Sequence, residues 1–219
     1  MTPSMPRLVV FDLAGTTLQD DGTVAEAFQE VLGAEGLNGS AEEIARVRGA
    51  SKREAFRKLA TGAEQAERLF HAFLAALRRR YEAVRPREVQ GTSAVFGWLR
   101  EQGVKVALNT GFERDTVDML LRMLGWDPGA FDAIVCGDEV AEGRPSSALI
   151  LEAMRRAGVS DAAYVMVVGD TVLDLQAGMS ARAGWVVGVT SGAHDHSRLL
   201  QSPHTHLIAS VAQLREILR

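Results

Sequence analysis

Five polar residues, from four separate stretches of the 219-residue sequence, are of types that suit chemistry on a phosphoryl group: Asp12, Thr110, Arg144, Asp170 and Asp174. Carboxylates that meet at one place form a site of hard oxygen ligands, and Mg²⁺ needs only one or two of them together with water and phosphate oxygens. A hydroxyl and a guanidinium could bind the remaining oxygens of a phosphoryl group in transfer. These types predict a divalent-cation site that acts on phosphorus, provided that the fold brings them together.

Apolar runs place two of the carboxylates at the ends of strands. The four apolar residues 8–11 lead directly into Asp12, and small, turn-forming residues follow, as is typical of a strand buried on both faces of a parallel sheet. The run 164–168 leads in the same way to Asp170. Ligands of open parallel sheets bind outside the carboxyl ends of the strands, so we expect Asp12 and Asp170 to meet there. An Asp that caps a helix or closes a turn is the alternative for Asp12.

Strands and helices alternate from Pro86 to the end of the chain. This alternation predicts βαβ units and an α/β fold, a doubly wound, Rossmann-like parallel sheet. We expect strands at 104–109, 133–136, 164–168, 185–189 and 206–209, and helices at 92–102, 114–124, 146–157, 172–182 and 211–218.

The segment between the first strand and Pro86 has a helical pattern throughout and no strand pattern. Ser40 with Glu43, and Ser51 with Glu54, are two capping signals, and apolar residues then recur at helical spacing from 63 to 81. We therefore predict a core domain of residues 1–19 and 87–219, interrupted by a helical cap domain of residues 20–86.

Composition narrows the class of protein. The chain is 47% hydrophobic and 24% charged, with a formal charge of −4, which offers no electrostatic footprint for nucleic acid or an anionic membrane. No apolar run approaches the roughly 20 residues that cross a bilayer, and residues 1–7 lack a signal-peptide pattern. A lone Cys136 excludes an intramolecular disulfide. We expect a cytoplasmic protein, and we expect His194 to be a solvated loop residue.

The motifs Asp12–Thr17, Thr110–Gly111, Arg144–Pro145 and Gly169–Asp174 resemble the four ordered motifs of the haloacid dehalogenase superfamily. The helical insertion resembles the cap of its first subclass, and the similarity covers nearly the whole chain. The resemblance implies that Asp12 is a nucleophile that becomes an aspartyl phosphate. It implies Mg²⁺ held by Asp12, the carbonyl of Ala14 and Asp170, with Asp174 supporting them from behind. Contacts to the phosphate or substrate are then expected from Thr16, Gly49, Thr110, Gly111 and Arg144.

Ala14 stands where most phosphatases of this superfamily carry an acidic residue that protonates the leaving group, a role worth about 10²–10⁴-fold. Ala14 together with Arg144 resembles the phosphonoacetaldehyde hydrolase branch, in which a cap lysine forms a Schiff base. Lys52, three residues after Gly49, is the matching candidate. Such a lysine must titrate low, which requires burial or a neighbouring cation such as Arg48 or Arg53.

Three alternatives stay open. The chain departs from the branch at Ala55, where a histidine is usual, and similar cap loops occur in sugar-phosphate mutases, so Lys52 could simply contact phosphate or a sugar. The chain would then be a phosphatase or phosphomutase that acts on a small phosphate ester. A non-catalytic phosphate-binding module is a third interpretation, which the presence of Asp12 and Asp170 disfavours.

Phe112 fits either a substrate contact or an apolar contact under the cap, and a homodimer formed through the cap is compatible with each alternative.

Overall fold

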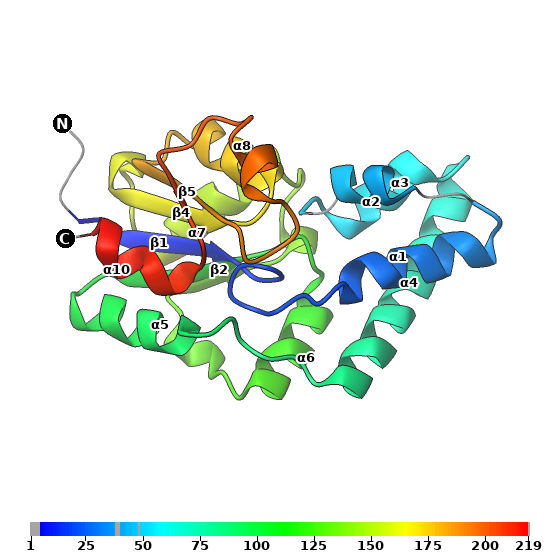
Figure 1. The fold of residues 1–219 in the computed structure, drawn as a ribbon, viewed down its shortest axis with the longest axis horizontal. Helices are drawn as coiled ribbons and strands as arrows, with labels where there is room; N and C mark the ends of the chain where they lie inside the picture. The colour runs from blue at the N-terminus through cyan, green and yellow to red at the C-terminus, as the bar shows by residue number, and fades with distance from the viewer. Residues whose placement is uncertain (1–4, 38–39, 48, 219) are drawn as a thin grey trace.

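The computed structural model describes residues 5–37, 40–47 and 49–218, and a six-stranded sheet lies at the centre of this part of the chain. The strands are β1 (Leu8–Asp12), β2 (Lys105–Asn109), β3 (Ala133–Val135), β4 (Val165–Gly169), β5 (Trp185–Val189) and β6 (His206–Ile208). All five pairings are parallel, in the order β3-β2-β1-β4-β5-β6. Figure 1 labels four of these strands, β2, β1, β4 and β5, side by side in the sheet. The winding direction reverses between β1 and β4, which is where ligands bind in such sheets. The predicted α/β fold is confirmed.

Helices cover both faces of this sheet. They are α5 (Thr92–Glu101), α6 (Arg114–Leu124), α7 (Ala148–Ala157), α8 (Val172–Ser180) and the short α9 (His196–Leu199) and α10 (Leu214–Ile217). Val9 and Phe11 of β1 share one apolar cluster with α5, α6 and α10, whereas Leu8 and Val10 share the other with α7 and α8. All four side chains are fully buried, as expected for a strand with helices on both of its faces.

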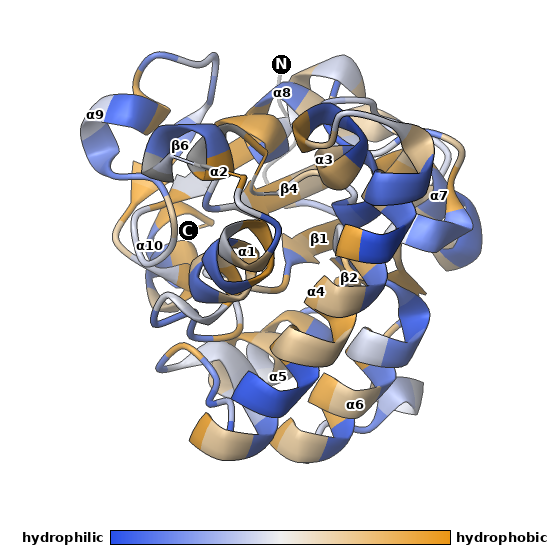
Figure 2. Ribbon diagram, turned by 90° about the vertical axis from the view of Figure 1, so that its right-hand side faces the viewer, coloured by the Kyte–Doolittle hydropathy of each residue, from blue (hydrophilic) through white to orange (hydrophobic). Residues whose placement is uncertain are grey.

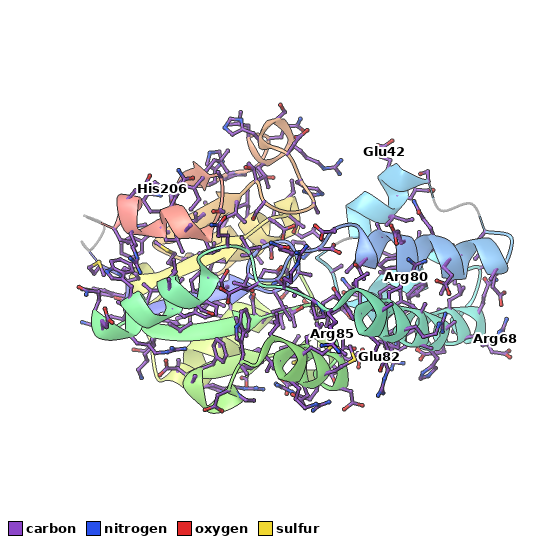
Figure 3. All side chains as sticks on the ribbon, turned by 60° about the horizontal axis from the view of Figure 1, so that its bottom comes forward. Glu42, Arg68, Arg80, Glu82, Arg85 and His206 are labelled. Atoms are coloured by element: carbon purple, nitrogen blue, oxygen red, sulfur yellow. The ribbon has the colours of Figure 1, made fainter. Side chains whose placement is uncertain are left out.

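Four helices form the segment between β1 and α5: α1 (Thr23–Ala34), α2 (Ala41–Val47), α3 (Lys52–Leu59) and α4 (Ala63–Val84). Their apolar sides meet around Phe28, Phe56 and Phe73, whose ring centroids lie 4.5–5.4 Å apart. Figure 2 shows that helices α1 and α4 each carry both hydrophobic and hydrophilic residues. Charged side chains such as Glu42 and Arg68 lie on the outside (Figure 3). The apolar residues of this segment are thus largely covered within one copy of the chain, and dimerisation through them stays a prediction.

The two backbone segments through which the chain enters and leaves the helical segment lie side by side. Leu18 and Glu88 form an isolated antiparallel bridge, the Gln19 N–H donates to the Arg87 carbonyl at 2.9 Å, and the Val89 N–H donates to the Thr17 carbonyl at 2.9 Å. The two crossings therefore coincide with the predicted domain boundaries, although the division into two domains remains a prediction.

Local expectations met different outcomes. The Ser40 capping box is confirmed, because its hydroxyl accepts from the Glu43 N–H at 3.2 Å and the Glu43 carboxylate accepts from the Ser40 N–H at 2.9 Å. The second capping signal is confirmed as a helix start, because Ser51 is the N-cap residue of α3 and the helix ends at Leu59 as expected, but the Ser51 side chain makes no capping hydrogen bond. The helix expected from 146 begins at Ala148. Among the described residues, no helix is long and apolar enough to span a membrane.

Candidate active site

Three neighbouring strands end at the same edge of the sheet and bring polar side chains together there. Asp12 ends β1, Asn109 ends β2 directly opposite it, and Asp170 follows β4. All three side chains are at most 5% exposed. Buried polar groups need partners, and a buried carboxylate needs a charged partner above all. The expected meeting of Asp12 and Asp170 at the strand ends is therefore present in the fold.

The carboxylates of Asp12, Asp170 and Asp174 form one buried cluster, each with an oxygen within 4.8 Å of an oxygen of the others. Asp170 accepts from the Thr16 hydroxyl at 3.1 Å and from the Ala193 N–H at 2.6 Å. Asp174 accepts from the Thr171 N–H at 3.0 Å and so caps α8. A donor set of closely spaced carboxylate oxygens fits a hard cation such as Mg²⁺. The assignment of Asp12, the Ala14 carbonyl and Asp170 as ligands stays a prediction.

Arg144 is the cationic partner of this cluster and is 2% exposed. Its Nη1 lies 2.7 Å from Oδ1 of Asp12, and its Nε lies 2.9 Å from Oδ1 of Asp174. Burial raises the pKa of the Asp12 carboxyl to about 6, with Asp174 adding to that rise and Arg144 opposing it. Burial acts to lower the pKa of the Arg144 guanidinium, but Asp174 and Asp12 outweigh burial and raise it. The guanidinium thus favours the ionised form of the nucleophile candidate.

The residues predicted to contact phosphate lie at the site, but in this conformation they bind protein groups. The Thr16 hydroxyl donates to Asp170, and the Thr110 hydroxyl accepts from the Phe112 N–H at 3.2 Å. Nη1 of Arg144 also donates to the Gly49 carbonyl at 3.1 Å. Their assignment to phosphate remains a prediction that requires these bonds to exchange when a ligand enters.

Residues 49–52, which lead into α3 and include its first residue, Lys52, lie directly on the strand-end loops, and we call them the cap loop. The Lys52 N–H donates to the Gly111 carbonyl at 3.3 Å. A Cβ on Gly111 would lie 2.2 Å from the Ala50 carbonyl oxygen, and one on Gly49, whose φ is +86°, would lie 2.6 Å from Oγ1 of Thr171. Contacts shorter than 3 Å are sterically excluded, so only glycine allows this approach at either position.

The Lys52 side chain, at the end of the cap loop, is 4% exposed. Its Nζ donates to the Ala50 carbonyl at 3.2 Å and lies 5.2 Å from the centroid of the Phe112 ring. Of the cations considered as its neighbours, Arg48 lies outside the described residues, and Arg53 pairs with Glu67 and stacks on a different ring. Burial rather than Arg53 therefore distinguishes Lys52 from an ordinary surface lysine.

Two residues of the site, His194 and Asn109, were not predicted from the sequence. The prediction that His194 is a solvated loop residue is wrong: it is 4% exposed, its Nδ1 accepts from the Val172 N–H at 3.0 Å, and its own N–H donates to the Asp170 carbonyl at 3.3 Å. The loop 191–194 thus packs on Asp170 beside a cavity of about 900 Å³, lined partly by Glu42 of α2. The second residue that was not predicted is Asn109, whose Oδ1 accepts from Arg144. The only signal in the sequence for a role of Asn109 is its position directly before Thr110.

Comparison with known proteins places this site in a family. Residues 9–187 match the family model "Haloacid dehalogenase-like hydrolase". The chain is 32% identical over 211 residues to the phosphonoacetaldehyde hydrolase of Hahella chejuensis, an alignment that covers 85% of this chain and 69% of that protein.

Solved structures agree in fold. A hydrolase from Pseudomonas syringae has a TM-score of 0.87 and 25% identity over 96% of each chain. A variant of CbbY from Rhodobacter sphaeroides, solved with xylulose 1,5-bisphosphate, has a TM-score of 0.81 and 20% identity, again over 96% of each chain. The second likeness concerns the fold alone. With the family model spanning most of its length, the chain belongs to the haloacid dehalogenase-like hydrolases.

Proposed function

We propose that this enzyme is a Mg²⁺-dependent hydrolase of the phosphonatase type, which cleaves the carbon–phosphorus bond of phosphonoacetaldehyde or a related small phosphonate. The observation that carries the proposal is the buried Lys52 amine, held by the cap loop against the loop that follows β2. The likeness to phosphonoacetaldehyde hydrolases and the presence of Ala14 in place of an acid support it.

Asp12 is the nucleophile in this proposal. Its carboxylate oxygen attacks phosphorus to form an aspartyl phosphate, which water then hydrolyses to phosphate and free Asp12. Arg144 orients the attacking carboxylate through its contact with Oδ1. Asp12, the Ala14 carbonyl and Asp170 would hold Mg²⁺, with Asp174 behind them; Mg²⁺ when bound supplies positive charge that offsets the charge gathering on the phosphoryl oxygens. The cap loop excludes water from the site while the bond breaks.

Lys52 solves the problem of the leaving group. Ala14 has no proton to give, so a carbanion leaving phosphorus must be stabilised in another way. The Lys52 amine condenses with the aldehyde and releases water, and the electron pair of the breaking carbon–phosphorus bond then enters the resulting imine to give an enamine. Protonation of the enamine carbon by solvent and hydrolysis of the imine release acetaldehyde and restore the lysine. This route needs a desolvated amine, which burial supplies.

The test is to incubate the protein with Mg²⁺ and phosphonoacetaldehyde and to measure acetaldehyde and phosphate together. Borohydride added during turnover should trap an adduct at Lys52, detected in the Lys52 peptide by mass spectrometry. Lys52→Met should lower turnover by about 10³-fold or more, as loss of a reacting group does, whereas Lys58→Met on the exposed side of the same helix should not. Acetaldehyde release with an unmodified Lys52 would contradict the imine.

A second candidate is a hydrolase or mutase that acts on a small phosphate ester, and Ala55 favours it. Ala55 is fully buried on α3, one turn after Lys52, so this position brings no imidazole to the lysine. Under this candidate Lys52 binds phosphate or sugar oxygens only. Release of phosphate from esters, without acetaldehyde from phosphonoacetaldehyde and without a borohydride adduct, would establish it.

A further inference from the structure

Arg144 is fully satisfied by protein acceptors. A guanidinium has five N–H donors and no acceptor. The Nε–H donates to Asp174, the two Nη1 donors go to Asp12 and the Gly49 carbonyl, and both Nη2 donors go to one residue, Asn109. Each nitrogen is thus held by a different part of the site, and Nη1 alone reaches the nucleophile candidate and the cap loop.

Asn109 binds Nη2 through two oxygens. Its backbone carbonyl lies 3.1 Å and its side-chain Oδ1 2.7 Å from Nη2. Because the guanidinium can only donate, the side-chain atom that faces it is the oxygen. The Nδ2 of Asn109 is then left buried, with no hydrogen-bond partner among the residues that the structure describes. Leaving the Nδ2 donor buried without a partner costs free energy. The contribution of this side chain to the site is therefore its Oδ1 acceptor.

We infer that Asn109 is a positioning residue: its Oδ1 holds Nη2 of Arg144 so that Nη1 stays on Oδ1 of Asp12. Asp174 holds Nε, and Asp12 and the Gly49 carbonyl hold Nη1. Among the described residues, Asn109 alone holds the remaining nitrogen, Nη2, and so opposes rotation of the guanidinium away from Asp12. Asn109 and Asp12 are register partners on adjacent strands, so their side chains emerge on the same face of the sheet. The catalytic part of this inference rests on the proposed function, with Asp12 as nucleophile.

The first test needs no substrate. Side-chain NMR of ¹⁵N-arginine protein reports rotation about the Cζ–Nη bonds, and the Arg144 signals are identified by their loss in Arg144→Lys. We expect separate, slowly exchanging Nη signals for the original protein and for Asn109→Asp, which keeps the acceptor oxygen. Asn109→Leu, of similar size without the acceptor, should average them. Unchanged signals in Asn109→Leu, or averaged signals in Asn109→Asp, would overturn the inference.

The second test is a double-mutant cycle on turnover. Asn109→Leu should lower kcat by about 10- to 100-fold, and by less than about 3-fold in an Arg144→Ala background, because residues that act as a unit are not additive. Equal losses in both backgrounds, with thermal midpoints unchanged, would show that Asn109 acts independently of Arg144 and would contradict the inference. Asn109→Asp should stay within about fivefold of the original kcat.

The two arms separate two kinds of failure. If the original protein hydrolyses neither phosphonates nor phosphate esters, the proposed function fails while the NMR signals still decide what Asn109 does to Arg144. If the original protein is active and Asn109→Leu is equally active, the inference fails and the proposed function stands.

Discussion

The carboxylate cluster at the sheet edge and the cap loop above it differ in how they are built. Asp12 and Asp170 extend from adjacent strands whose backbones are fixed by parallel pairing, and Arg144 links Asp12 to Asp174. The cap loop has no strand to hold it. It touches the sheet edge through backbone groups and two glycines, and it carries one reactive side chain, Lys52.

This difference separates two tasks. Attack on phosphorus requires charges held in a fixed arrangement, which strand ends provide without reorganisation. Under the proposed function, the choice between carbon and oxygen as leaving atom depends on Lys52, a group that arrives with the cap loop and that a second element can bring or withdraw. Changes at the sheet edge should therefore abolish every reaction of this enzyme, whereas changes in the cap loop should select among reactions.

The largest expected effect is that of Asp12→Asn, which keeps the shape of the side chain and removes the proposed nucleophile. Phosphate release from phosphonoacetaldehyde and from phosphate esters should both fall by about 10⁴-fold or more. The matched control, Asp21→Asn, changes an exposed carboxylate at the start of the helical segment and should leave both rates unaltered. Retention of ester hydrolysis by Asp12→Asn would break the comparison, because the sheet edge would then not serve both reactions.

Stability offers the next test, in the helical segment itself. Phe73 is fully buried against both Phe28 and Phe56, so Phe73→Ala should lower the free energy of unfolding by about 3–5 kcal/mol. The exposed Arg78 on the same helix provides the control, since Arg78→Ala should change it by about 0.5 kcal/mol or less. Chemical denaturation followed by circular dichroism measures both.

The outcome of that experiment also bears on the predicted division of the chain. A helical cap that is a separate domain should lose its structure before the sheet does, giving two transitions in Phe73→Ala. A single unfolding transition of the whole protein, at a lower denaturant concentration than that of the original protein, would contradict independent unfolding of residues 20–86.

The fold is largely predictable from the sequence because its strands are short apolar runs with clear ends. The run 8–11 is apolar throughout and ends in a charged residue, so neither its period nor its end is ambiguous. Element ends were less predictable. The expected helix at 211–218 is a 3₁₀ turn, Val211–Gln213, followed by one turn of α-helix, Leu214–Ile217; its apolar residues Val211 and Leu214 are fully buried, and 3₁₀ turns are frequent at the ends of α-helices.

Sequence predicts the types of the site residues better than their partners. That Asp12 and Asp170 meet follows from strand ends alone. That both Nη2 donors of Arg144 go to Asn109, or that His194 is buried beside Asp170, depends on the path of loops that carry no periodic signal. Lys52 is partly predictable: the sequence indicates its position in the cap loop, but its burial depends on the tertiary structure.

The smallest predicted effect tests the contact between the two regions without touching a reactive group. In Gly111→Ala the new Cβ would lie 2.2 Å from the Ala50 carbonyl oxygen and 2.8 Å from its carbon, so the cap loop must move away from the sheet edge. We expect kcat/KM for phosphonoacetaldehyde to fall by about 30-fold, near 2 kcal/mol, because Lys52 is displaced from the reacting carbon. Ester hydrolysis should fall less. Gly97→Ala is the control, since a Cβ there meets nothing within 4 Å on α5 and should stabilise the helix by about 0.5–1 kcal/mol. If Gly111→Ala slowed both reactions equally, the cap loop would act only as a lid, and the sheet edge alone would determine the chemistry.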